Sequence, residues 1–144
     1  MPVREYDPKG ISVIFGGKIL HGFSDSEFIK AERNEQSFTL KVGVDGEGTR
    51  SKNNNLSGKI TITLMQSSLS NDDLSTFQQL DEQSGAGALP FLMSDANGTT
   101  LVSALTAWVQ KPADDTEAKE VSTRVWVIET DNMSKFTGGN VVAG

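Results

Sequence analysis

The sequence of 144 residues contains no cysteine and only one histidine, His21. The lack of cysteine excludes a thiol nucleophile, a disulfide framework and a thiolate site for zinc, and it suits a reducing cytoplasm. A catalytic triad that needs histidine would depend on His21, and no serine lies in a G-x-S-x-G nucleophile elbow. We therefore expect a protein that is not an enzyme and that has no catalytic residues, no metal site and no cofactor.

Long apolar runs and a positive net charge are also missing. No stretch approaches the roughly 20 apolar residues of a membrane span, and residues 1–10 lack the apolar core of a signal peptide. The 13 basic and 19 acidic side chains give a net charge of −6, which is the wrong sign for a protein that grips phosphates. We expect no membrane insertion, no cleaved export signal and no tight binding of nucleic acid.

Alternation of apolar and polar residues with a period of two dominates the chain and predicts a mainly β domain. Gly16-Gly17 is typical of a two-residue hairpin turn, and Asn97-Gly98 predicts a second hairpin. Segments 37–44 and 59–64 have the alternation of half-buried strands, and the polar segment 45–57 between them predicts a long loop. The segments predicted as strands are 11–15, 18–23, 37–44, 59–64, 89–94, 99–110 and 121–130.

A single helix is predicted over residues 71–83. Ser70 is placed to cap its N-terminus, acidic residues follow in the first turn, and Gly85 is placed to end it. Its apolar stripe is narrow, so we expect the helix to lie on the surface of the sheet and to cover one end of the β core. The stripe consists of Leu74, Phe77 and Leu80.

The last two predicted strands carry apolar residues on both faces. Alternation sets Leu101, Leu105 and Val109 against Val102, Ala104 and Trp108, and Val125 and Val127 against Trp126 and Ile128. One face must cover the core, and the other needs a second cover, which is either a neighbouring subunit or the helix or a terminal segment. As candidate subunit-interface residues we name Val102, Trp108, Trp126 and Ile128.

The loop 45–57 contains the basic and amide-rich run of the sequence, namely Arg50, Lys52, Asn53, Asn54 and Asn55. One interpretation is a solvated loop. The other is a docking loop, because guanidinium and amide groups make directional hydrogen bonds that define register between copies. Acidic residues at 114–120 are a class of complementary partner for it.

Several longer motifs complete the sequence pattern. They are ERNE at 32–35, VGVDGEGTRSKNNN at 42–55, SG at 57–58, LMQSS at 64–68, SND at 70–72, TAWVQKP at 106–112, WVIETDNM at 126–133, Phe136 and GGN at 138–140. Through these motifs, over nearly its whole length, the chain resembles a family of phage structural proteins identified with the tail tubes of contractile-tailed bacteriophages.

The resemblance implies a fold similar to other tube proteins of phage tails and of type VI secretion. A single domain, 1–144, would consist of two packed antiparallel sheets in a sandwich or open barrel, one flanking helix and an extended loop, followed by a C-terminal tail at 131–144. Subunits of such tubes form hexameric rings that stack, with strands of six copies joined edge to edge around the lumen. Segment 45–57 would reach the adjacent ring.

The partners implied are further copies of the chain, the tail sheath, a baseplate or tube initiator, a tail terminator and a tape-measure protein. Double-stranded DNA would pass through the channel during ejection without specific binding. The protein would be located in the virion tail and assembled in the cytoplasm of the host bacterium.

Candidate lumen-facing residues are Thr39, Lys41, Thr61 and Thr63, because small hydroxyl groups wet a pore without gripping DNA; the lysine counts against this assignment. Two readings from other classes stay open. One is a small β-sandwich binding module of a phage or secretion-like particle, and the other is a hydrolase that uses carboxylates alone. A bacteriocin or type VI secretion tube would share the same physics without carrying a genome.

Overall fold

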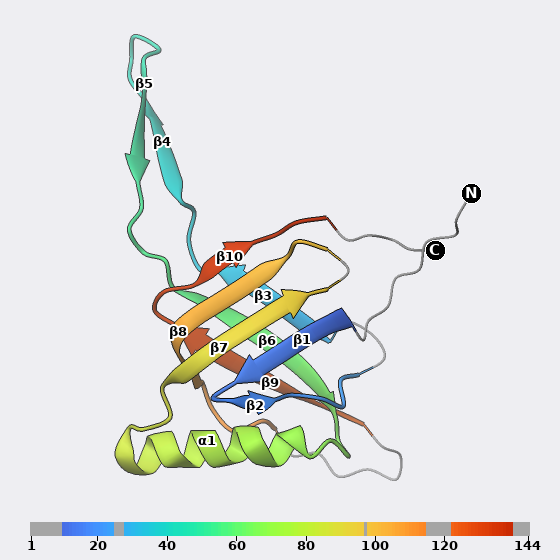
Figure 1. Ribbon diagram of the computed structural model, residues 1–144. Coiled ribbons are helices and arrows are strands. Elements are labelled where there is room, and N and C mark those ends of the chain that lie inside the picture. The colour runs from blue at the N-terminus through green and yellow to red at the C-terminus, as the bar shows by residue number, and fades with distance from the viewer. Residues whose placement is uncertain (1–9, 25–27, 97, 115–121, 140–144) are drawn as a thin grey trace, which may run out of the picture.

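Two layers of β-strands joined at a corner form the body of the molecule in the computed structural model, which describes residues 10–24, 28–96, 98–114 and 122–139. These residues form ten strands and one helix (Figure 1). In chain order they are β1 Ile11–Phe15, β2 Lys18–Ile19, β3 Ile29–Arg33, β4 Phe38–Val42, β5 Gly48–Lys52, β6 Gly58–Met65, α1 Ser70–Ser84, β7 Leu89–Asp95, β8 Leu101–Val109, β9 Thr123–Thr130 and β10 Ser134–Phe136.

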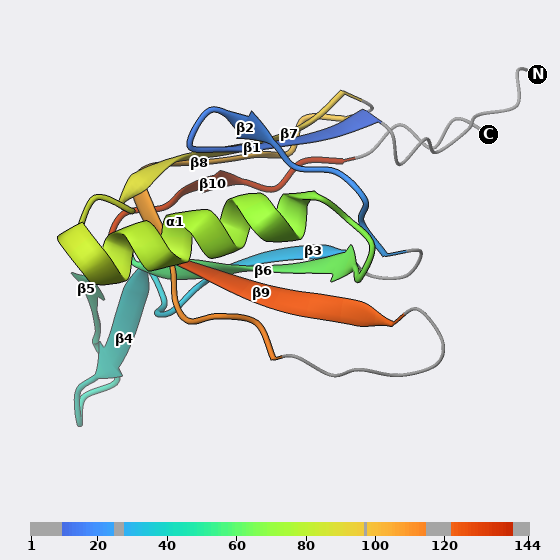
Figure 2. The same cartoon turned by 90° about the horizontal axis from the view of Figure 1, so that it is seen from below.

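The main sheet has the strand order β2-β1-β7-β8-β9-β6-β3, with β10 also paired to β8, and a separate hairpin contains β4 and β5. Figure 2 shows that this sheet folds over, so that β1, β2, β7, β8 and β10 lie in a first layer and β3, β6 and β9 in a second. The corner is at the end of β8, where Ala107 and Val109 pair with β9. The predicted fold class, mainly β with two packed antiparallel layers, one helix and an extended segment, is confirmed, as an open and not a closed arrangement.

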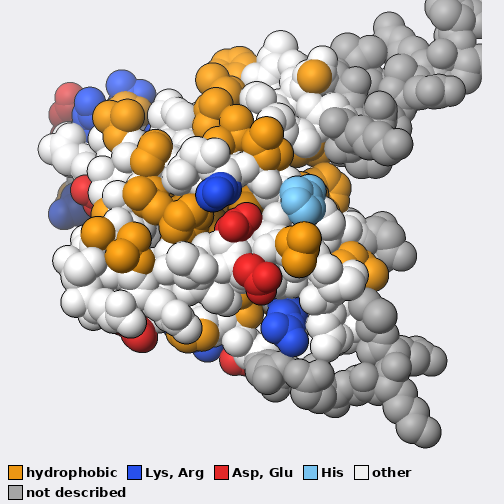
Figure 3. All heavy atoms as spheres, turned by 60° about the horizontal axis from the view of Figure 1, so that its bottom comes forward, with side chains coloured by type: hydrophobic (Ala, Val, Ile, Leu, Met, Phe, Trp, Pro, Cys, Tyr) orange, Lys and Arg blue, Asp and Glu red, His pale blue; other side chains and the backbone are white. Residues whose placement is uncertain are grey.

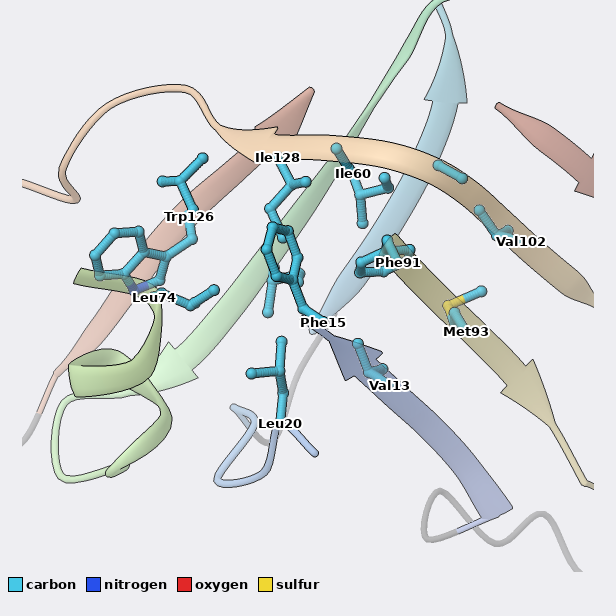
Figure 4. Close-up of a cluster of buried hydrophobic side chains, with 14 of the residues drawn as sticks. Val13, Phe15, Leu20, Ile60, Leu74, Phe91, Met93, Val102, Trp126 and Ile128 are labelled. Atoms are coloured by element: carbon cyan, nitrogen blue, oxygen red, sulfur yellow. The ribbon is translucent and has the colours of Figure 1, made fainter. Parts of the chain in front are cut away.

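The core lies between the two layers, and both contribute alternate residues to it (Figure 4). Strand β6 alternates strictly between buried and half-buried residues, as its sequence predicts. Each fully buried aliphatic or aromatic side chain contributes about 1.5–3 kcal/mol relative to exposure. The largest core residues include Phe15, Ile60, Ile62, Leu64, Leu74, Phe91, Trp126 and Ile128.

The turn between β1 and β2 has the predicted two-residue form. Phe15 pairs with Lys18, and Gly16 and Gly17 have φ angles of 58° and 82°. Both angles are in the region that only glycine adopts without strain.

Helix α1 lies across one end of the molecule, between the two layers (Figure 2). Leu74 is fully buried, and the ring of Phe77 stacks on Phe15 with 5.3 Å between centroids. Leu80 is exposed, so the core-facing stripe is shorter than predicted. The prediction that the helix covers one end of the β core is confirmed.

The helix begins differently from the prediction. Leu69 occupies the N-cap position, and Ser70 is already helical. The Ser70 hydroxyl instead accepts a hydrogen bond of 2.9 Å from the backbone N–H of His21, while the Ser68 hydroxyl accepts one of 3.1 Å from the Ser70 N–H. The capping role predicted for Ser70 is therefore wrong, because Ser68 reaches the free amide. Gly85, with φ 69°, ends the helix as predicted.

A buried amide fixes this helix end against the second layer. The Asn71 side chain donates to the backbone oxygens of Met65 (3.0 Å), Gln66 (3.3 Å) and Ser68 (2.9 Å). Its Oδ1 accepts a 2.9 Å hydrogen bond from the indole Nε1 of Trp126. Every donor and the acceptor of Asn71 are thus paired, as a buried polar group requires.

Strand β8 contains an irregularity that the sequence pattern conceals. Leu89 pairs with Ala107 and Phe91 with Ala104, so β8 has one residue more than β7 between these pairs. Such a bulge turns the following side chains over. Val109 consequently shares the core side with Val102, whereas alternation had grouped Val102 with Trp108, which lies on the outer side.

Candidate assembly surfaces

The hairpin β4–β5 has two unlike faces. Directly opposite residues in an antiparallel pair share a face, and the register joins Phe38 to Lys52, Leu40 to Arg50 and Val42 to Gly48. The exposed fractions of Phe38, Leu40 and Val42 are 43%, 67% and 63%. We call this side the apolar face of the hairpin. The opposite side is polar, with Thr39 and Lys41 facing Ser51 and Thr49.

The hairpin protrudes from the body of the molecule (Figure 1). Segment 38–42 forms a strand as predicted, but its half-burial is wrong, because β4 pairs only with β5 and every residue of both strands is exposed. Residues 48–52 of the predicted loop form β5. The extended segment is therefore a two-stranded arm with a turn at 43–47.

Arg50 belongs to the apolar face of this arm. Its guanidinium carbon lies 4.2 Å from the centroid of the Phe38 ring. Such a cation–π contact holds the charge beside the apolar side chains. Lys52 lies on the same face, so the structure brings these two predicted contact residues together.

The three asparagines lie at the base of the arm, and two of them form hydrogen bonds within the chain. Asn53 Nδ2 donates to Glu35 at 2.8 Å, and Asn53 Oδ1 accepts from the Asn55 N–H at 2.9 Å. Asn55 Oδ1 accepts from the Ser57 N–H at 3.0 Å. Asn53 and Asn55 therefore shape the base of the arm, and Asn54 is exposed between them.

The outer face of the first layer is a second uncovered apolar surface. Register places Ile19, Ile14 and Leu92 in one row and Leu101 and Phe136 in the next. Figure 3, which brings the helix end forward, shows hydrophobic side chains gathered above the helix over this layer. Within the described residues no element covers this face, and apolar patches of this kind mark interaction sites.

Three of the four predicted interface residues lie in the core. Val102, Trp126 and Ile128 are buried between the layers, so the prediction that they meet another subunit is wrong. Both faces of these strands are apolar, and alternation alone does not say which face turns inward. Trp108 is half-buried on the outer side of the corner, opposite Glu129.

The candidate lumen residues fall into two groups. Thr61 and Thr63 lie on the outer side of β6, whereas Thr39 and Lys41 lie on the protruding arm. Beside the β6 threonines, Glu32 forms ion pairs with Lys59 at 3.7 Å and with Lys30 at 4.0 Å. Exposed pairs of this kind contribute about 0–1 kcal/mol, so they shape the charge of this face more than its stability.

Other site types find no support in the described part of the chain. It contains no group of three or more acidic or histidine residues arranged to hold a metal ion. None of its helices is long and apolar enough to cross a membrane. His21 is exposed, and its backbone bonds to Ser68 and Ser70. Of the acidic residues at 114–120, the class of partner expected for the loop 45–57, those at 115–120 lie outside the described residues, as does Asn97 of the predicted turn before β8.

Comparison with known proteins points to one biological setting. The model of the family "Bacteriophage PhiTE tail tube protein" matches residues 12–138. The structural protein ORF10 of Pseudomonas phage KPP10 is 29% identical over 143 residues, covering 94% of this chain and 83% of that protein.

Two solved structures share the fold. The tube-terminating cap of the anti-feeding prophage has a TM-score of 0.57 at 11% identity, covering 95% of this chain and 92% of that chain. The sheath/tube terminator of an extracellular contractile injection system, PVC, in its extended state has a TM-score of 0.59 at 11% identity, covering 92% and 96%.

Proposed function

The chain belongs to the family of the bacteriophage PhiTE tail tube protein, and from this premise we propose that it is the tail tube subunit of a contractile-tailed phage. It forms hexameric rings that stack around a channel through which DNA passes during ejection. At the coarser level of description, the chain is a structural protein of phage tails.

The observation that carries this proposal is the presence of two unlike uncovered surfaces on one small domain. The apolar face of the arm and the outer face of the first layer each lack a cover within the described residues. Contacts between unlike surfaces are heterologous, and they generate rings when the rotation closes and continuing tubes when it does not. A tail tube needs both kinds of repetition.

Sheet edges support the same proposal. Strands β2 and β3 stand at the two ends of the strand order, and each pairs on one side only among the described strands. Joining such edges between copies removes unpaired backbone groups that otherwise promote uncontrolled association. Six copies joined in this way surround a lumen, and the hydroxyl-bearing face with Thr61 and Thr63 is our candidate for its lining.

The remaining partners follow from this role. The outer wall of the tube meets the sheath, its ends meet the baseplate initiator and the terminator, and its channel holds the tape-measure protein before DNA. The net charge of −6 keeps DNA from adhering to the tube as it passes. The protein is placed in the virion tail after assembly in the host cytoplasm.

A tube-terminating ring is the second candidate function. It is favoured by the fold shared with a tube cap and a sheath/tube terminator of contractile injection systems. A terminator forms one ring at the end of the tube, so it needs contacts around the ring but does not repeat along the tail.

Negative-stain electron microscopy of the purified protein over a concentration series, with light-scattering mass in parallel, tests the proposal. A tube subunit should give stacked rings or hollow tubes, and a terminator should stop at single rings. A monomer at every concentration, also with baseplate extract added as a nucleus, would favour a binding module.

Quantitative mass spectrometry of purified virions separates the two candidates independently of assembly in vitro. A tube subunit repeats along the whole tail and should be among its most abundant proteins. A copy number equal to one ring would assign the chain as a terminator.

A further inference from the structure

The apolar face of the arm has no cover within the described part of its own chain. Strands β4 and β5 make their main contacts with each other, and the arm points away from the body (Figure 1). Phe38, Leu40 and Val42 are all exposed. Three large apolar side chains in a row on a protruding hairpin favour contact with another protein surface.

A groove whose lining includes an exposed apolar side chain lies at the bulge of β8. The extra residue there leaves both Leu105 and Thr106 on the outside, and Leu105 is 90% exposed. The second wall is the segment that follows β9. The groove is lined by Pro90, Ser103, Leu105, Thr106, Asp131 and Asn132, among others.

A buried hydroxyl holds the two walls of the groove in place. Thr130 Oγ1 donates a 2.7 Å hydrogen bond to the backbone oxygen of Thr106 and accepts one of 3.2 Å from the Asn132 N–H. Thr130 is buried beneath both walls. The groove is therefore a fixed shape, which lowers the entropy cost of docking a partner.

The charges of the two surfaces are complementary. The groove contains the exposed carboxylate of Asp131 and no basic side chain in its lining. The apolar face of the arm contains Arg50 and Lys52. Complementary charges steer association and fix register, and Arg50 is already held beside Phe38 in position for a carboxylate.

Two other hollows of the described surface fit the arm less well. One is lined by Lys111 and Arg124, and the other by Lys30 and Lys59. Each contains one carboxylate as well, but the basic pairs would repel Arg50 and Lys52. Charge thus distinguishes the groove on β8 from these two hollows.

Resting on the proposed tube, we propose that the arm of one copy docks in the β8 groove of a neighbouring copy. Leu40 packs against Leu105, and the Arg50 guanidinium pairs with the Asp131 carboxylate. Each copy then offers one arm and one groove, so the contact repeats from copy to copy.

The absence of cysteine from the chain allows a direct cross-linking test. The double variant Leu40→Cys with Leu105→Cys is assembled and oxidised gently, then separated on a denaturing gel without reductant. The expected result is a ladder of covalent multimers, because every arm can be linked to a neighbouring groove. Each single variant can form at most a covalent dimer.

The pair Leu40→Cys with Leu92→Cys is the matched control, since Leu92 is exposed on the same layer outside the groove lining. A ladder from this pair, or an assembled tube without a ladder from the first pair, overturns the docking and leaves the tube function standing. Unmodified protein that never assembles would remove the tube function, and the docking with it.

A charge exchange tests the same contact without cysteine. Asp131→Arg should raise the concentration needed for assembly about tenfold or more, and adding Arg50→Asp should restore it to within a few-fold. Glu82→Arg makes the same charge change on the exposed last turn of α1, outside the groove, and should have little effect. Failure of the double exchange to restore assembly of a folded protein overturns the pairing.

Discussion

Replacing Asn71 with alanine should destabilise the domain more than any single surface substitution. The side chain is buried where α1 begins, and it donates to three backbone oxygens while accepting from the indole of Trp126 at 2.9 Å. Alanine removes all of these bonds. The tie between the helix and the second layer is lost.

The magnitude follows from which groups lose their partners. The buried indole N–H of Trp126 donates to Asn71 Oδ1, and leaving this donor without an acceptor costs about 1–3 kcal/mol. The Met65 and Ser68 oxygens keep backbone donors, from the N–H groups of Ser68 and Asn71, so they add about 1 kcal/mol between them. The sum is about 2–4 kcal/mol, equivalent to a Tm lower by roughly 6–15 °C for a domain of this size.

Urea unfolding of dilute monomer, followed by tryptophan fluorescence, measures this loss. Asn54→Ala is the matched control, because Asn54 is exposed and should change stability by less than about 0.5 kcal/mol. Asn71→Asp should also destabilise, since a carboxylate would face backbone oxygens in place of the amide donors. If the free energy of unfolding of Asn71→Ala lies within about 0.5 kcal/mol of that of the unmodified protein, this account of the helix end is refuted.

Three further predictions concern the sheet and the arm. Gly58→Ala places a Cβ atom 2.7 Å from a backbone oxygen of β3 and should cost about 1–3 kcal/mol in thermal melts, whereas Gly139→Ala, with nothing within 4 Å, should cost little. Thr130→Val removes the hydroxyl that joins the groove walls. It should lower the free energy of unfolding by about 1–3 kcal/mol and speed hydrogen exchange of the Asn132 amide; unchanged exchange would contradict that role. Replacing Arg50 and Lys52 together with alanine should impair assembly in sedimentation, while the free energy of unfolding measured with urea stays within about 0.5 kcal/mol of the unmodified protein; tubes of normal length would contradict it.

The strands and the helix could be predicted because local patterns specify them. Alternation over 59–64 reports one buried side, and the structure places that side in the core. Gly16-Gly17 requires positive φ angles, and Gly85 ends the helix with another. In each case a few neighbouring residues contain all of the information that the prediction needs.

The surfaces could not be predicted, because they depend on distant parts of the chain. Phe38, Leu40 and Val42 alternate like a half-buried strand, and this pattern reports an apolar side without saying whether its cover comes from the same chain. The same ambiguity explains the wrong prediction for Trp126: alternation reports an apolar face, and the structure places that face in the core instead of at an interface. The sequence does not predict the groove, because its walls meet only in the folded protein and the alternation of β8 conceals the extra residue.

The bulge in β8 also decides where the chain tolerates changes of length. Before it, Val102 and Ala104 point inward, and after it, Ala107 and Val109 do, so the inward positions shift by one residue across the bulge. Removing one residue between Ala104 and Ala107 would leave a regular strand with the same side chains inward, but only one of Leu105 and Thr106 would remain outside, and the groove would lose part of its wall. The turn at 43–47 faces only solvent and has no such constraint. Insertions and deletions are therefore expected at the tip of the arm, while the corner where the two layers join keeps its residue count.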